Sequence, residues 1–189
     1  MNSITLVKHR ALGLPALALA LLTLASSAKA QDHSAPDRQA PELPSPVCDS
    51  VEVPAGNRVS AHVYALGVQI YQWNDSAWVF VAPEAELFAD PGYHGSVGIH
   101  YAGPTWEAND GSQVVAAREA GCSPFPGAIP WLRLAAVATF EHGRFAGVTY
   151  IQRVNTIGGT APAEAGTHVG EEARVPYTAE YYLYRATKD

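Results

Sequence analysis

Lysine is scarce in this chain of 189 residues, and none lies between residues 29 and 188. Residues 1–30 hold three of the twelve basic residues and no acidic residue, so the eighteen acidic residues leave the remainder with a net charge of −9. Nucleic acids and anionic membrane surfaces are polyanions, which makes a protein of this charge a poor partner for either. We therefore expect no nucleic-acid partner.

Motifs that bind phosphate groups or metal ions are also missing. The chain has no Gly-rich loop of the dinucleotide or P-loop type, and no serine stands in the nucleophile-elbow pattern. It has no Cys-x-x-Cys or His-Glu-x-x-His, and the spacing of His94 and His100 matches no standard metal motif. We expect no cofactor and no metal ion, and these absences favour a protein that is not an enzyme.

Long hydrophobic runs are absent, but a short one lies near the start of the chain. The apolar segment from Ala11 to Leu24 has 14 residues, whereas a membrane-spanning helix needs about 20. It follows basic residues at 8–10 and precedes the small-residue motif at 28–30, which together form the pattern of a secretory signal peptide. We predict a signal peptide over residues 1–30, cleavage between Ala30 and Gln31, and a secreted or periplasmic protein without a membrane anchor after cleavage.

Cysteine is limited to Cys48 and Cys122. Two cysteines in an oxidising compartment predict a disulfide bond, and the alternative is two thiols too far apart to meet. The bond would close a loop of 75 residues, for which the chain-entropy model gives about 4 kcal/mol of stabilisation.

Prolines are concentrated just before the first cysteine. Residues 31–46 contain four of them, and Leu43 is the one large apolar residue in that stretch. Such a segment cannot bury enough surface to offset the entropy lost on ordering. We predict a Pro-rich disordered linker over residues 31–46, followed by a single domain over residues 47–189.

The predicted domain has the pattern of β-strands. Residues 58–66 alternate between two sets of side chains, as a half-buried strand does. Residues 68–73 and 77–82 flank Asn-Asp-Ser, which predicts a hairpin with Trp73 opposite Trp78 and Tyr71 opposite Phe80. Core packing is the preferred role of these aromatic residues, and a sugar-binding face is the alternative.

Further strands are predicted over residues 97–101, 113–118, 147–155 and 175–185. Residues 131–139 fit either a strand or a helix, because a proline precedes them. One helical turn is predicted over Glu84–Leu87. Many short segments separated by Gly and Pro predict an all-β sandwich or barrel of short antiparallel strands, with at most one or two short helical turns.

The candidate site is the segment from His100 to Asp110, which combines imidazole, aromatic rings and carboxylates within eleven residues. Binding sites combine apolar surface with a few polar groups in this way. The predicted ligand-contacting residues are His100, Tyr101, Trp106, Glu107 and Asp110. The structural alternative is that Gly103-Pro104 forms a bend between strands and Trp106 fills the core.

Three functions remain compatible with these observations. The leading hypothesis is a binding module for an envelope glycan or another small molecule. The second is a secreted hydrolase that uses a pair of carboxylates, with Glu107 as one member. The third is a structural or stress-related envelope protein without a small ligand.

Seven short motifs distributed over the predicted domain are specific enough to compare with known families. They are Gly67-x3-Tyr71 and the segments at 78–85, 100–107, 110–112, 129–132, 150–159 and 175–181. Together they resemble the secreted domain-of-unknown-function 3455 family, over residues 53–186. The resemblance implies export and provides no established activity. It also implies that many relatives have cysteines at the positions of Trp73 and of a residue near Thr167. If those two pair in relatives, this chain has lost that bond and relies on Cys48–Cys122 instead.

Overall fold

The computed structural model describes residues 39–187. The predicted signal peptide, its cleavage site between Ala30 and Gln31, and the first part of the predicted linker lie outside the described residues. In the described part of the chain, no helix is long and apolar enough to cross a membrane.

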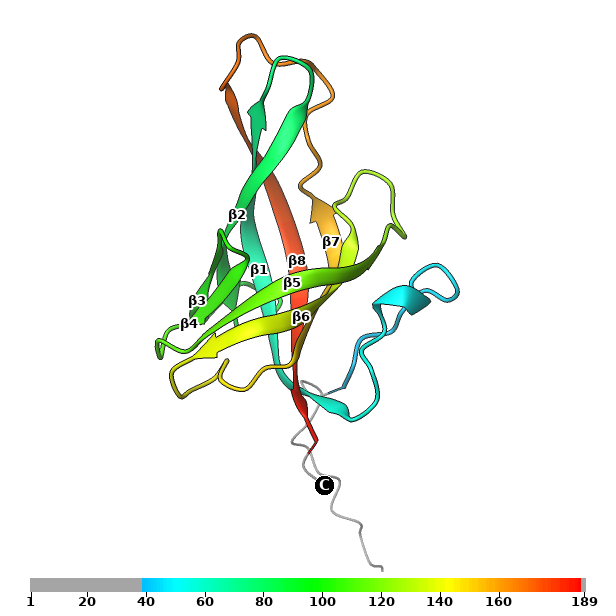
Figure 1. The fold of residues 1–189 in the computed structure, drawn as a ribbon, viewed down its shortest axis with the longest axis vertical. Helices are drawn as coiled ribbons and strands as arrows, with labels where there is room; N and C mark the ends of the chain where they lie inside the picture. The colour runs from blue at the N-terminus through cyan, green and yellow to red at the C-terminus, as the bar shows by residue number, and fades with distance from the viewer. Residues whose placement is uncertain (1–38, 188–189) are drawn as a thin grey trace, which may run out of the picture. The chain divides into compact units, whose positions relative to one another are not determined.

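The fold is a closed antiparallel barrel in which each strand pairs with the next and the last pairs with the first (Figure 1). The strands are β1 (Asn57–Trp73), β2 (Trp78–Phe88), β3 (Ser96–Tyr101), β4 (Thr105–Ala108), β5 (Gln113–Cys122), β6 (Trp131–Phe140), β7 (Tyr150–Gly158) and β8 (Glu172–Ala186). The all-β prediction is confirmed, and the barrel is the form observed. Two strands are longer than expected, with 17 residues in β1 and 15 in β8.

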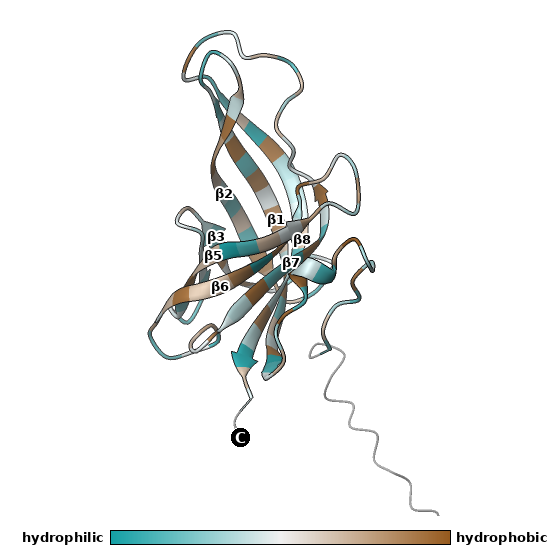
Figure 2. Cartoon of the chain, turned by 45° about the vertical axis from the view of Figure 1, so that its right-hand side comes forward, coloured by the Kyte–Doolittle hydropathy of each residue, from teal (hydrophilic) through white to brown (hydrophobic). Residues whose placement is uncertain are grey.

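Hydrophilic and hydrophobic residues alternate along the strands (Figure 2). The hydrophobic ones turned inward give the barrel an apolar interior. On β1 the interior positions begin with Val63 and Ala65, which lie next to Tyr181 and Ala179 of β8. Side chains from every strand and from the β6–β7 connection fill this core, including Leu87, Trp106, Val114, Leu134, Phe145, Ile151 and Leu183. The core reaches from the β6–β7 connection to the other end of the barrel, where several of its residues border polar ones.

The predicted β1–β2 hairpin is confirmed in its register. Tyr71 is opposite Phe80 and Trp73 is opposite Trp78, with ring centroids 5.8 and 5.6 Å apart. This hairpin and the start of β8 extend beyond the other strands (Figure 1). Aromatic cross-strand pairs fix the register, because a shift by one residue would turn each ring to the opposite face.

The helical turn predicted at Glu84–Leu87 is wrong, because β2 continues through Phe88. Ala85 and Leu87 are buried in the barrel while Glu84 and Glu86 are exposed, which is the period of a strand. The ambiguous residues 131–139 belong to strand β6, where Leu134 is buried in the core. For residues 131–139, burial in the barrel therefore decided for a strand, although the preceding proline is also compatible with the start of a helix.

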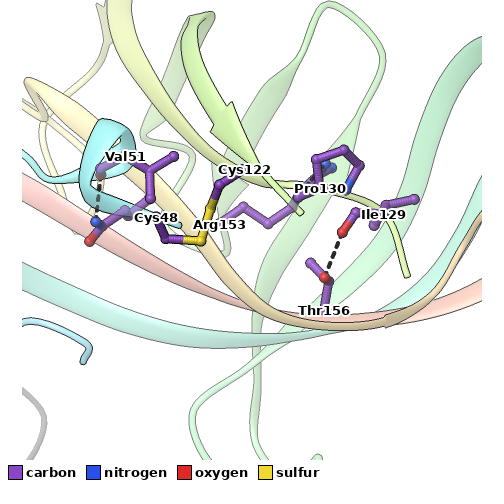
Figure 3. The surroundings of a disulfide bond; sticks show 8 residues. Cys48, Val51, Cys122, Ile129, Pro130, Arg153 and Thr156 are labelled. Carbon is purple, nitrogen blue, oxygen red and sulfur yellow. Dashed lines mark hydrogen bonds between the residues drawn. A yellow bond between two sulfur atoms is a disulfide. The ribbon is translucent and has the colours of Figure 1, made fainter. Parts of the chain in front are cut away.

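The predicted disulfide between Cys48 and Cys122 is confirmed (Figure 3). It joins the residue before the short helical turn η2 (Asp49–Val51) to the end of β5. The two cysteines, Val51, Trp131 and Val154 form an apolar cluster outside the barrel, which we call the outer cluster, and Leu43 packs against it. The segment before β1 thus covers one outer face of the sheet.

Candidate ligand-binding site

A pocket of about 430 Å³ occupies the end of the barrel where the β1–β2, β3–β4 and β5–β6 connections meet. Consecutive strands of this barrel run in opposite directions, so these connections lie at one end and the β6–β7 connection at the other. The polar residues that line the pocket are Gln69, Tyr71, His100, Arg118, Arg153 and Tyr181. Its apolar lining includes Phe80, Val81, Pro83, Trp106, Leu132 and Leu134.

Three aromatic rings lie between the pocket and the apolar core. His100 stacks on the Trp106 indole, with centroids 4.0 Å apart and an angle of 15° between the planes. Tyr181 meets both rings at their edges, 5.2 Å from His100 and 5.3 Å from Trp106. Stacked and edge-to-face contacts of this kind hold aromatic side chains in fixed orientations. This base of the pocket is therefore rigid.

His100 is held as a neutral imidazole. Burial lowers its pKa from the usual 6.5 to about 3, despite the opposing effect of its hydrogen bond to Thr105. Nδ1 lies 2.8 Å from the Thr105 carbonyl oxygen, which can only accept, so Nδ1 carries the proton. The other ring nitrogen, Nε2, is therefore an acceptor in the neutral side chain.

Four buried side-chain nitrogens among the described residues have no hydrogen-bond partner, those of Trp131 and Arg185 and two on residues that line the pocket. The latter two are Nε2 of Gln69 and Nε1 of Trp106, whose residues are 2% and 1% exposed. Gln69 is close enough to Tyr177 to lower the pKa of that hydroxyl, but Nε2 makes no hydrogen bond of normal geometry. An unpaired buried donor costs about 1–3 kcal/mol, so native proteins rarely retain one without a reason.

Two arginines contribute positive charge to the pocket. Nε and Nη2 of Arg153 donate hydrogen bonds to the Pro130 carbonyl at 3.1 and 2.8 Å. Arg118 reaches the same pocket from β5. No aspartate or glutamate lines the pocket, and within the described residues neither arginine forms an ion pair.

The wall next to Arg153 is fixed by contacts from several strands (Figure 3). The Thr156 hydroxyl donates to the Ile129 carbonyl at 2.6 Å, and Arg153 holds the next carbonyl, that of Pro130. The disulfide fixes the other end of the same connection at Cys122. The β5–β6 connection is therefore anchored at both ends, and its last residues line the pocket.

The structure separates the predicted site residues according to strand alternation. His100 and Trp106 point inward and line the pocket. Tyr101 and Glu107 follow them in sequence and lie on the outer face, where the Tyr101 hydroxyl donates to Glu107 Oε2 at 2.8 Å. Gln113 donates to the same oxygen at 3.1 Å. Successive residues of a strand cannot share one face, so the predicted set does not converge on one ligand.

Asp110 lies at the opposite end of the barrel, in the β4–β5 turn. Its carboxylate accepts hydrogen bonds from the hydroxyl and backbone N–H of Ser112, at 2.5 and 3.0 Å, and from the N–H of Arg144, at 2.7 Å. The hydrogen bond from the Ser112 hydroxyl is the largest of the effects that lower its pKa. Asp110 thus connects this turn to the β6–β7 connection.

Other carboxylates and histidines from the sequence analysis are dispersed. Glu84 pairs with Arg174 at 2.8 Å on the surface, and exposed His94 pairs with Asp90 at 3.1 Å. Among residues 39–187, no three His, Cys, Asp or Glu side chains are placed to hold a metal ion.

Sequence reasoning missed Gln69, Arg118 and Arg153. Each occupies a position with the same alternation as apolar interior residues of its strand: Gln69 follows Val63 and Ala65, and Arg153 follows Ile151. The sequence signal for these residues is a polar side chain on the otherwise apolar side of a strand. This signal identifies a site residue only when the interior side of each strand is known.

The fold belongs to the class of eight-stranded up-and-down barrels, whose interior is either filled by side chains or holds one small ligand. The chain belongs to the family described as Protein of unknown function (DUF3455), which matches residues 54–185. No curated protein and no solved structure matches the chain. The family resemblance noted in the sequence is thereby confirmed.

Proposed function

We propose that this protein is an exported binding protein that holds one small, mainly apolar molecule in the end of its barrel. The observation that carries the proposal is the pocket of about 430 Å³, lined by buried Gln69 and Trp106 with unpartnered donors. Binding pockets in proteins usually have volumes of about 300–1,000 Å³, mostly apolar walls and a few polar groups that orient the ligand. A bound molecule would satisfy the donors that the fold leaves unpaired.

The pocket favours an apolar molecule over the glycan considered from the sequence. A sugar ring stacks on an open aromatic face, but Trp106 is 1% exposed and His100 covers one side of its indole. Phe80, Leu132 and Leu134 offer hydrocarbon surface in its place. Export is supported by the signal-peptide pattern over residues 1–30 and by the Cys48–Cys122 disulfide.

A thermal-shift screen tests the proposal with protein exported by a host cell. The panel contains cell-wall sugars and small aromatic and aliphatic compounds. A ligand at 100 times its dissociation constant stabilises the fold by about 2.7 kcal/mol. For a domain of this size that corresponds to a rise in Tm of about 5–10 °C. We expect such a rise with apolar compounds.

A pair of variants locates the binding. Leu132→Trp fills the pocket with an indole, whereas Val137→Trp adds the same group at an exposed position of the same strand. Binding should be lost in the first variant and retained in the second. Absence of any shift with apolar compounds, or equal binding by both variants, would overturn the proposal.

A further inference from the structure

We infer that the ligand is an organic anion, with an apolar body and a carboxylate as the group that reaches the polar part of the pocket. This inference rests on the proposed function and adds the chemical class of the ligand. It comes from two independent features of the lining: the type of unpaired hydrogen-bonding group and the sign of the charge.

Gln69 and Trp106 both line the pocket, and their buried Nε2 and Nε1 donors have no hydrogen-bond partner. Nε1 of tryptophan can only donate, so a water or ligand atom that satisfies it must accept. A carboxylate has two oxygens that only accept, and charge-assisted hydrogen bonds to such oxygens are shorter and stronger than neutral ones. A cation or an ammonium group would leave both donors unpaired.

The charge of the lining agrees with the donors. Arg118 and Arg153 line the pocket without an acidic neighbour there. The chain as a whole has a net charge of −6, so a positive pocket departs from its average. A guanidinium group matches a carboxylate in geometry as well as in charge.

The geometry holds the Arg153 guanidinium group at the pocket, where it also contacts the Tyr181 hydroxyl. Nε and Nη2 point to the Pro130 carbonyl, which fixes the plane of the guanidinium group. That contact does not use Nη1. Because Arg153 also influences the pKa of Tyr71, Tyr181 and His100, its charge lies close to all three side chains of the pocket. The positive charge is therefore held where the aromatic base and the apolar walls meet.

Matched probes separate charge from hydrophobicity. We would measure binding of 2-naphthoate, 2-naphthylmethanol and 2-naphthylmethylamine, and of decanoate, decanol and decylamine, by calorimetry at low salt. The expected order in each series is carboxylate, alcohol, amine, with the carboxylate bound about tenfold or more tightly than the alcohol.

The variants Arg153→Gln and Arg118→Gln should each weaken carboxylate binding about tenfold and weaken alcohol binding by a much smaller factor. Retained alcohol binding also demonstrates that the barrel is intact. Arg133→Gln removes an outer arginine and should change neither affinity. If the alcohol binds as tightly as the acid, or if Arg133→Gln has the same effect as Arg153→Gln, the anion inference fails and the proposed function stands. If no probe of either series binds, the proposed function itself fails.

Discussion

Gly67 is a position on β1 where a side chain would collide with the neighbouring strand. A Cβ atom there would lie 2.1 Å from the Glu84 carbonyl oxygen and 2.5 Å from Cα of Ala85, both backbone atoms of β2. Backbone atoms cannot move aside as the end of a flexible side chain can. We expect Gly67→Ala to lower the free energy of unfolding by about 3 kcal/mol, measured by urea denaturation.

Gly127→Ala provides the control for this prediction. Gly127 has a φ of +80° and no atom within 4 Å of an added Cβ, so alanine there meets backbone strain without a collision. The expected loss is about 1 kcal/mol. If Gly67→Ala were as mild as Gly127→Ala, the close approach of β1 and β2 would be contradicted.

His100 makes stability depend on pH in a defined direction. Its pKa is lowered from 6.5 to about 3 by burial, so between these values the unfolded chain binds a proton that the folded chain does not. The stabilising contribution is therefore complete above pH 6.5 and is lost as pH falls toward 3. The loss is on the order of 5 kcal/mol. His100→Gln cannot titrate, so urea unfolding at several pH values should give it a shallower dependence between pH 6.5 and 4.

His142→Gln is the control, because His142 is exposed and its replacement should leave the pH dependence unchanged. Below pH 4.5 a separate effect begins. The pKa of Glu180 is lowered chiefly by its hydrogen bond with His62, so its contribution is lost as pH falls through that lowered value. Parallel curves for His100→Gln and the unaltered protein between pH 6.5 and 4 would contradict the prediction.

At the scale of residues, the sequence identified chemistry better than orientation. His100 and Trp106 were chosen for their aromatic and polar character, and both line the pocket. Tyr101 and Glu107 were chosen for the same reason, but they lie on the outer face because strand β3 begins before the segment and β4 follows at once. Residues that are consecutive in a strand point to opposite faces of the sheet, so a cluster in the sequence is divided between the two faces. The sequence alone did not locate the short strand β4.

Among the structural elements, the disulfide connects the segment before β1 to the wall of the pocket. Cys48 and Cys122 are buried in the outer cluster with Val51 and Trp131. The variant C48S/C122S should lose about 4 kcal/mol of stability, because the unfolded chain regains the freedom of a 75-residue loop. Urea denaturation of both proteins measures this difference.

Chemical reduction tests whether the loss of stability arises from the disulfide bond. Reducing agent should lower the stability of the unaltered protein to that of C48S/C122S and leave the variant unchanged. We also expect weaker ligand binding in the variant, because Cys122 ends the strand that precedes the β5–β6 wall. Equal stability of oxidised and reduced protein would contradict a stabilising role for the bond.

Elements with local signals were predictable, and those decided by distant contacts were not. The β1–β2 hairpin was predicted in its register because turn residues and aromatic pairs lie close together in sequence. Residues 84–87 were misjudged because a proline was taken as the end of a strand, whereas Pro83 is buried within β2. Gly166 packs so closely on Trp73 that a Cβ atom would lie 2.4 Å from the ring.

At the scale of the whole molecule, closure of the barrel depends on residues far apart in the chain. β1 pairs with β8 from Asn57 opposite Ala186 to Gln72 opposite Glu172. The alternation of side chains within a strand shows which residues share a face, but it does not show which strand lies beside it. The sequence therefore left both a sandwich and a barrel open. Only the closed arrangement brings Arg153 of β7, Gln69 of β1 and His100 of β3 into one pocket.

Export and oxidation should act together on the complete chain. We propose that residues 1–30 direct export and that cleavage follows Ala30, so mass spectrometry of the exported protein should detect Gln31 as the first residue. Its mass should be lower than that of the reduced protein by the two thiol hydrogens, because Cys48 and Cys122 are joined. A version without residues 1–30, retained in a reducing cytoplasm, should keep both thiols and be less stable by about 4 kcal/mol. Recovery of the full chain from the membrane fraction would contradict cleavage, whereas a reduced exported protein would contradict the link between export and the disulfide.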